Sequence, residues 1–177
     1  MLTQHTKSQP VQHNVARLDD QGRIDIKSLS LAQLEEWTLA SIGESKPVAL
    51  RVFKELWQRG ARTFAEMPSI RRELQEKLEK VARISFLEPH LVLRSEDGTV
   101  KFLWKLHDGH AIESVLIPDG ERLTLCMSSQ VGCAMACTFC LTGDLGLKRN
   151  LTPSEIANQA LQVGLQATRD GQRITNL

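Results

Sequence analysis

The chain has 177 residues, enough for one domain with a core or for a small domain joined to part of a larger one. Hydrophobic residues make up 41% and charged residues 24%, which excludes the disordered and membrane-spanning classes. The formal net charge of +1 excludes binding to nucleic acid through bulk positive charge. Any RNA contact must therefore come from local basic patches.

The N-terminal segment is polar and is predicted to be a tail covering residues 1–25. Met1 to Val15 contain no basic cluster followed by an apolar run, so neither a secretory signal nor an anchor is expected. Apolar stretches stay shorter than the roughly 18 residues that a membrane-spanning helix needs. We expect a cytoplasmic protein without membrane contact.

From Leu29 onward the apolar residues follow a helical period, which predicts a small helical accessory domain over residues 26–83. Ser30 can cap a first helix that ends near Gly43, and Pro47 suits the start of a second. A third helix is expected over residues 69–82. The first helix bears Leu31, Leu34, Trp37 and Leu39, and the third places Ile70, Leu74, Leu78 and Val81 on one face. In the second helix the positions predicted to be buried are Leu50, Val52, Phe53, Leu56 and Trp57.

Residues 84–120 change to the period of strands and are predicted to form a β-meander. Its turns are expected at Asp97-Gly98, Asp108-Gly109 and Asp119-Gly120. A further strand over residues 122–129 places Leu123, Leu125 and Met127 on one face. The opposite face carries Thr124, Cys126 and Ser128, so Cys126 should point away from the apolar layer.

Residues 121–177 follow the order strand, long loop, helix, strand. Thr152 is a predicted N-cap, Pro153 suits the first helical position and Glu155 completes a capping box. The helix should reach Asp170, with Ile156, Ala160, Val163 and Ala167 along its buried stripe, and residues 174–177 should begin another strand. This is one β/α unit of an α/β barrel or a doubly wound sheet, so the predicted fold class is α/β.

Three of the four cysteines lie in the loop after residue 129, as Cys133, Cys137 and Cys140. Clustered cysteines in a reducing cytosol are more often metal ligands or catalytic groups than disulfides. Three thiolates can hold a [4Fe–4S] cluster and leave one iron open. The alternatives are a structural zinc site with Cys126 as fourth ligand, or cysteines that pack in a core.

The sequence around these cysteines resembles the RlmN/Cfr family of radical SAM methyltransferases. The resemblance rests on Cys-Met-Ser-Ser-Gln-Val-Gly-Cys ending at Cys133, on Cys-Thr-Phe-Cys-Leu-Thr-Gly beginning at Cys137, and on Arg-Asn-Leu-Thr beginning at Arg149. It extends upstream through Glu-Ser-Val-Leu-Ile-Pro beginning at Glu113, and covers nearly all of the chain after Asp25. The sequence departs from the family after Pro47, where Val48 and Ala49 replace an aromatic-Arg pair.

The resemblance implies the beginning of a radical SAM partial (β/α) barrel and methylation of adenosine C2 in 23S ribosomal RNA and beside the anticodon of transfer RNA. It implies that Cys133, Cys137 and Cys140 hold a [4Fe–4S] cluster whose open iron binds S-adenosylmethionine. It assigns Glu113 as proton acceptor and Cys126 as transient disulfide partner of a cysteine farther along the family's chain. An electron donor for the cluster and a monomeric state are further expectations.

The residues alone leave several alternatives open. Glu113 lies on a strand face with Val115 and Ile117, an apolar setting for a base, but the residues alone favour a salt bridge at a sheet rim. Cys126 could be a small core residue. The basic side chains Lys46, Arg51, Lys54, Arg59 and Arg62 could follow RNA phosphates or form a solvated helix face. Alternative functions are a zinc-stabilised RNA-binding module, an inactive gene remnant or a Cfr-type C8 methyltransferase.

Overall fold

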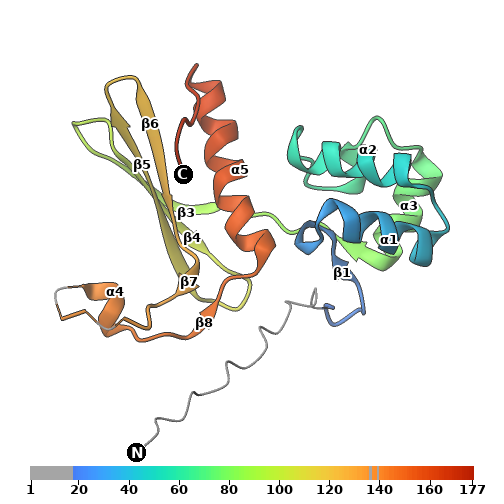
Figure 1. The fold of residues 1–177 in the computed structure, drawn as a ribbon, viewed down its shortest axis with the longest axis horizontal. Helices are drawn as coiled ribbons and strands as arrows, with labels where there is room; N and C mark the ends of the chain where they lie inside the picture. The colour runs from blue at the N-terminus through green and yellow to red at the C-terminus, as the bar shows by residue number, and fades with distance from the viewer. Residues whose placement is uncertain (1–17, 136, 139) are drawn as a thin grey trace, which may run out of the picture.

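The computed structural model describes residues 18–135, 137–138 and 140–177. The three helices α1 to α3 gather on one side of the molecule, and a four-stranded sheet lies on the other (Figure 1). The long helix α5 (Pro153–Arg169) runs along the sheet, on the side that faces the helical part. None of the described helices is both long enough and apolar enough to span a bilayer. Residues 1–17 of the predicted tail lie outside the described residues.

The helical part forms as its capping residues predict. Its elements are β1 (Ile24–Asp25), the 3₁₀ turn η1 (Ile26–Ser28), α1 (Leu31–Ile42), α2 (Lys46–Trp57), the 3₁₀ turn η2 (Phe64–Glu66), α3 (Arg72–Val81) and β2 (Ala82–Arg83). Ser30 caps α1 through a capping box with Gln33, and Gly43 ends the helix in the left-handed conformation. Both predicted helix boundaries are confirmed.

One residue predicted to be buried in α2 lies outside. Leu50 is 39% exposed, whereas Val48, Ala49, Val52 and Leu56 are at most 5% exposed. These four residues follow the i, i+1, i+4, i+8 spacing of one helix face, and Leu50 falls outside that face. The prediction for Leu50 was wrong because the α2 stripe begins at Val48, a residue that we had not placed in the core.

The end of the predicted tail is ordered. Ile24 and Asp25 form β1, which pairs in parallel with β2. The Asp25 side chain is buried and accepts hydrogen bonds from the backbone of Lys27 and Ser85 and from the hydroxyl of Ser154. Residues 24–25 are therefore held by long-range polar contacts that the local sequence does not reveal.

The sheet is an antiparallel meander in the order β3-β4-β5-β6. Its strands are β3 (Pro89–Arg94), β4 (Val100–Lys105), β5 (Ala111–Asp119) and β6 (Arg122–Met127). Glycines with positive φ occupy the three predicted turns, at Gly98, Gly109 and Gly120. The strand expected over residues 122–129 is observed as β6, which pairs with β5 over residues 122–127 and ends two residues earlier than predicted.

A parallel contact begins on the free edge of β6. Thr124 pairs in parallel with Asn176, and the backbone of Leu125 donates to the carbonyl of Asn176. The chain therefore leaves β6, forms α5 and returns parallel to β6, as in a β/α/β unit. Thr152 caps α5 with Pro153 at its start and Glu155 in a capping box, as predicted. The α/β fold class is confirmed.

Candidate active site and its cysteine loop

The two faces of the sheet differ in what covers them. Toward α5 lie the buried side chains Val100, Phe102, Trp104, Ile112, Leu116, Leu123 and Leu125, which pack with Val163 and Ala167 of α5. The opposite face carries Glu113 and Cys126, both exposed. In α/β barrels the helices lie outside and the other strand face lines the interior. Glu113 and Cys126 therefore occupy the face that corresponds to a barrel interior.

Glu113 forms an ion pair across the sheet. Its Oε2 lies 3.5 Å from Nζ of Lys101, and both side chains are about half exposed, at 51% and 47%. Ile117, on the same face, is 40% exposed. Among the described residues, nothing covers Glu113 enough to create the apolar setting expected from the sequence. The salt bridge, the second of the two alternatives, is present.

Cys126 points away from the apolar layer, as its place in the strand predicts. It is exposed, whereas its neighbour Leu125 is fully buried. Cys126 lies opposite Val115, two residues along β5 from Glu113 and on the same face. Packing in the core is thereby excluded for this cysteine.

The cysteine loop is closed at its base by two short strands. β7 (Gln130–Val131) pairs antiparallel with β8 (Arg149–Asn150). The backbone of Lys148 donates to the carbonyl of Val131, and the Gln130 amide donates to the Asn150 side chain at 2.9 Å. The segment 132–148 thus leaves and re-enters the molecule at one point, beside the start of α5 (Figure 1).

Gly132 lets the two ends of this loop cross closely. Its φ is +72°, and a Cβ at this position would collide with the carbonyl oxygen of Gly146. Only glycine combines that conformation with such a close approach. Gly132 therefore fixes the entrance of the loop immediately before Cys133.

The three loop cysteines are half-buried free thiols. Cys133 Sγ accepts a hydrogen bond from the backbone of Met135, and the Cys140 backbone donates to the Cys137 carbonyl just before α4 (Leu141–Asp144). Within the described ranges, no three His, Cys, Asp or Glu side chains converge as ligands of one metal ion. The donor set, three thiols on one tethered loop, is nevertheless the set that a [4Fe–4S] cluster with an open iron requires.

Arg149 ties the base of the loop to two other elements. Its Nη1 and Nη2 bind both oxygens of Glu155 at 2.8 and 2.9 Å, and its Nε binds Asp108 at 2.7 Å. Burial pushes the pKa of Glu155 upward, but the hydrogen bonds from Arg149 and the Thr152 backbone outweigh it and leave the pKa below its ordinary value. The bond to Glu155 is the main cause that raises the pKa of Arg149. Arg149, Glu155 and Asp108 therefore stay charged. This group of three residues, the Arg149 clasp, joins β8, α5 and the β4–β5 turn.

A buried amide joins α5 to the end of β6. Gln159 is fully buried, and its Oε1 accepts from the Ser114 hydroxyl at 2.7 Å and from the Ser128 backbone at 3.0 Å. The Ser128 hydroxyl in turn donates to the backbone carbonyl of Glu113 at 2.8 Å. Gln159 thus helps to hold the strand that carries Glu113 beside the strand that enters the loop.

This network is not predictable from the apolar pattern of α5. Residues 158 and 159 were outside the predicted apolar stripe of α5, yet both are at most 1% exposed. Asn158 accepts from Nζ of the buried Lys27 at 2.8 Å, a contact across 131 residues. Two adjacent amides beside an apolar helix stripe were the only local signal for these contacts.

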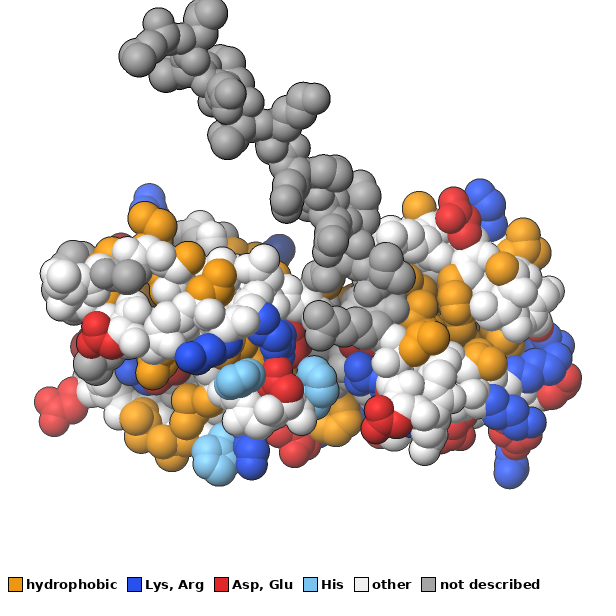
Figure 2. All heavy atoms as spheres, turned by 90° about the horizontal axis from the view of Figure 1, so that it is seen from below, with side chains coloured by type: hydrophobic (Ala, Val, Ile, Leu, Met, Phe, Trp, Pro, Cys, Tyr) orange, Lys and Arg blue, Asp and Glu red, His pale blue; other side chains and the backbone are white. Residues whose placement is uncertain are grey.

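The basic stretch from Lys46 to Arg62 is partly neutralised. Lys46 pairs with Glu35, Arg59 with Glu55 and Arg62 with Glu88. Val48 and Ala49, where the sequence departs from the RlmN/Cfr pattern, are buried in the helical core and cannot reach RNA. Basic and acidic side chains are interspersed over both halves of the face in Figure 2.

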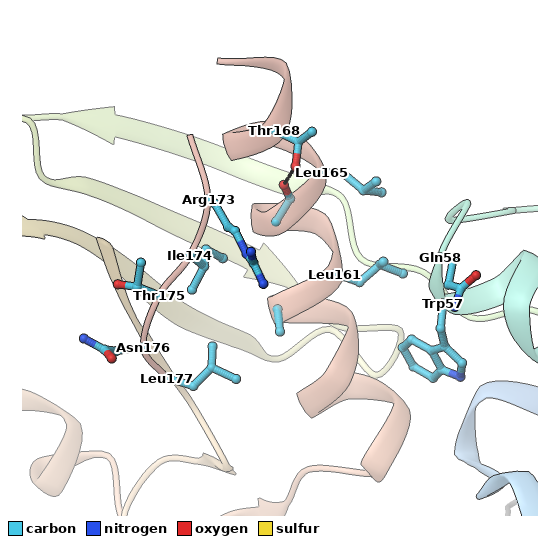
Figure 3. Close-up of a pocket in the computed structure, with 12 residues that line it drawn as sticks. Trp57, Gln58, Leu161, Leu165, Thr168, Arg173, Ile174, Thr175, Asn176 and Leu177 are labelled. Carbon is cyan, nitrogen blue, oxygen red and sulfur yellow. Dashed lines mark hydrogen bonds between the residues drawn. The ribbon is translucent and has the colours of Figure 1, made fainter. Parts of the chain in front are cut away.

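A mainly apolar pocket lies away from the cysteine loop. It has a volume of about 490 Å³ and is lined by Trp57, α5 residues such as Leu161 and Leu165, and residues 173–177. Figure 3 shows Ile174 and Leu177 beside α5, with the Thr168 hydroxyl bonded to the Gly164 carbonyl. The pocket contains none of the predicted site residues.

Known proteins match both the helical part of the chain and the part that contains the sheet and the cysteine loop. Residues 24–84 match the model of the Ribosomal RNA large subunit methyltransferase N-terminal domain. The Dual-specificity RNA methyltransferase RlmN of Geobacter sulfurreducens is 54% identical over 140 residues, which are 79% of this chain and 39% of that protein. RlmN 2 of Myxococcus xanthus is 48% identical over 83% of this chain and 39% of its own length.

A solved structure agrees with the sequence comparisons. The radical SAM methyltransferase from Sphaerobacter thermophilus superposes with a TM-score of 0.77 at 35% identity, covering 86% of this chain and 45% of that one. The fold is therefore that of the N-terminal part of a radical SAM methyltransferase. Within that class, the chain is similar to the RlmN methyltransferases, carries the matched N-terminal domain over residues 24–84, and spans about two fifths of the length of the curated relatives it matches.

Proposed function

We propose that the chain is the N-terminal portion of a radical SAM RNA methyltransferase that modifies C2 of adenosine in 23S ribosomal RNA and in transfer RNA. One observation carries the proposal: a tethered loop with three free thiols leaves the end of β6, and the face of the sheet not covered by α5 carries Glu113 and Cys126. The names of the relatives support RNA as the substrate class.

In this proposal Cys133, Cys137 and Cys140 hold a [4Fe–4S] cluster. Such a cluster would bind S-adenosylmethionine at its open iron and supply the electron for its reductive cleavage. The chain contributes the thiols and the pinned loop base that holds them beside α5. A cytoplasmic electron donor and a monomeric state belong to the same proposal.

Glu113 and Cys126 are proposed to act on the RNA and not on the cluster. Glu113 is exposed and lies beside Lys101, so its carboxylate can accept the proton that leaves adenine C2. Cys126 presents a free, exposed thiol on the same face. After the methylene carbon has bonded to adenine, this thiol can attack the sulfur of the methyl-carrying cysteine, so that the S–C bond breaks, the carbon keeps the electron pair and takes up a proton, and a transient disulfide forms. The roles of both residues remain predictions.

The function is tested with a chimera in which the C-terminal portion of the Geobacter sulfurreducens relative follows this chain. After anaerobic reconstitution with iron and sulfide, reductant and labelled S-adenosylmethionine, it should form 2-methyladenosine in unmodified 23S ribosomal RNA. The Glu113→Gln and Cys126→Ala variants should still cleave the cofactor but accumulate an RNA–protein adduct. Product at adenine C8, or normal turnover of either variant, would contradict the proposed chemistry.

A further inference from the structure

A second pocket, of about 240 Å³, lies where the helical part, the sheet and α5 meet. Its walls come from the linker after β2, the end of β4 and the first turn of α5. The side chains that matter for its chemistry are Arg83, Phe86, Lys105, His107, Asp25 and Glu155. The pocket and the cysteine loop occupy the same end of the molecule, because that loop leaves β6 and returns into the start of α5 (Figure 1).

Two cations of this pocket have spare binding capacity. Nε of Arg83 is shielded from solvent and has no hydrogen-bond partner in the described part of the chain. Its Nη2 lies 3.8 Å from Asp25, too far for a good hydrogen bond. Lys105 is exposed and makes no ion pair with any described residue. An anion in the pocket could satisfy both side chains.

The two acids of the pocket are already engaged. Asp25 accepts from two backbone amides and from the Ser154 hydroxyl. Glu155 is held by both nitrogens of the Arg149 fork and by the Thr152 backbone. His107, 72% exposed, lies 3.8 Å from Glu155 and adds a further donor at the rim. The pocket therefore combines carboxylates that are already hydrogen-bonded with two cations that have donors to spare, which favours an anionic ligand.

An aromatic ring at the rim indicates the kind of anion. Phe86 is 43% exposed, and the Arg62 guanidinium lies over its ring at 5.4 Å from the centroid. Arg62 is itself fixed by Glu88 at 2.9 Å. An exposed ring beside a cationic pocket is the combination with which proteins bind single-stranded nucleic acid, since bases stack on the ring while cations contact the backbone.

We propose that this pocket binds one backbone phosphate of a single-stranded RNA segment through Arg83 and Lys105, with an adjacent base stacked on Phe86. The inference rests on the proposed function and adds a contact outside the reaction site. A phosphate held here fixes the position of the RNA strand near the cysteine loop without reading its sequence.

The test measures binding of a short fluorescein-labelled single-stranded oligoadenosine RNA to the 177-residue chain by anisotropy, over a series of salt concentrations. Arg83→Gln and Lys105→Gln should each weaken binding several-fold and reduce the slope of log affinity against log salt by about 0.7. Phe86→Ala should weaken binding about tenfold and leave that slope unchanged. Arg122→Gln, at the opposite end of β6, is the matched control and should bind as the parent does.

Circular dichroism checks that each variant is folded, and Lys105, being exposed, keeps the test valid if Arg83→Gln fails to fold. The inference would be overturned if Lys105→Gln kept the parental affinity and salt slope and Phe86→Ala also kept the parental affinity. An equal loss in Arg122→Gln would also overturn it, since binding would then follow overall charge. The chimera assay tests the proposed function separately. If the chimera transfers methyl groups while the pocket variants bind RNA as the parent does, the phosphate-binding role of the pocket is overturned and the proposed function is not.

Discussion

The face of the β3–β6 sheet toward α5 and the opposite face are built from alternate residues of the same strands. Phe102 and Trp104 are at most 2% exposed on the covered face, whereas Leu93 and Glu113 are about half exposed on the open one. The covered face binds α5 through apolar packing and one buried hydrogen-bond network. The open face carries the groups proposed to react. Under the proposed function, stability and chemistry are therefore assigned to opposite sides of one sheet.

The largest expected effect comes from deleting a side chain on the covered face. Leu125→Ala should lower the free energy of unfolding by about 2–5 kcal/mol, because Leu125 is fully buried against the α5 side of the sheet. Leu93→Ala, at a position 53% exposed on β3, should change it by less than about 0.5 kcal/mol. Urea denaturation measures both. Similar losses in the two variants would mean that the open face is covered in solution.

The contact of the buried Lys27 with Asn158 of α5 can be tested through the pH dependence of stability. Burial lowers the pKa of Lys27 to about 8, although the charge of Asp25 acts in the opposite direction. The unfolded state, with an ordinary lysine pKa of 10.5, then holds more protons between pH 8 and 10.5. The free energy of unfolding should therefore rise across that window, by on the order of 1–3 kcal/mol.

Lys27→Met should remove this rise, because the methionine has no proton to lose. Urea denaturation of both proteins below pH 8 and near pH 10 provides the measurement. Parallel pH dependence in the parent and the variant would mean that Lys27 is solvated, and that its contact with Asn158 does not persist in solution.

The polar network on the covered face should give a smaller loss. Gln159→Ala leaves the Ser114 hydroxyl and the Ser128 backbone without their acceptor, at a cost of about 1–2 kcal/mol. Gln172→Ala, at an exposed position after α5, should be neutral. Chemical denaturation gives the comparison, and an unchanged Gln159→Ala protein would show that water replaces the amide.

Alanine substitutions at Gly132 and Gly109 test how closely the two ends of the cysteine loop cross. Both have positive φ, but a Cβ on Gly109 meets open space and a Cβ on Gly132 meets the Gly146 carbonyl. Gly109→Ala should cost only the backbone strain of about 1–2 kcal/mol. Gly132→Ala should in addition open the base of the loop and speed hydrogen exchange of the Lys148 amide, which bonds to Val131. Equal protection of that amide in both variants would contradict the close crossing.

Local sequence patterns predicted the parts of the fold that local chemistry decides. The caps at Ser30 and Thr152 and the glycine turns of the meander were found because each depends on residues close in the chain. The alternation in β6 also placed Cys126 on the open face. These predictions needed no knowledge of distant partners.

Contacts between distant segments were not predictable in this way. Asp25 was assigned to the tail because its partners Ser85 and Ser154 lie 60 and 129 residues away. The Arg149 clasp includes Asp108, which lies 41 residues away in the sequence. The Arg-Asn-Leu-Thr motif marks Arg149 in the sequence but does not indicate this partner. The division at residues 83 and 84 and the ligand role of the three loop cysteines stay predictions.

The most direct measurement of the central claim is the iron content of the reconstituted chain and its cysteine variants. After anaerobic treatment with iron and sulfide, the parent and Cys126→Ala should bind equal amounts of iron and show the absorption of a [4Fe–4S] cluster. Cys133→Ala, Cys137→Ala and Cys140→Ala should each lose it. Equal loss in Cys126→Ala and Cys133→Ala, or a colourless protein that binds zinc, would contradict the account and favour a four-thiolate structural site.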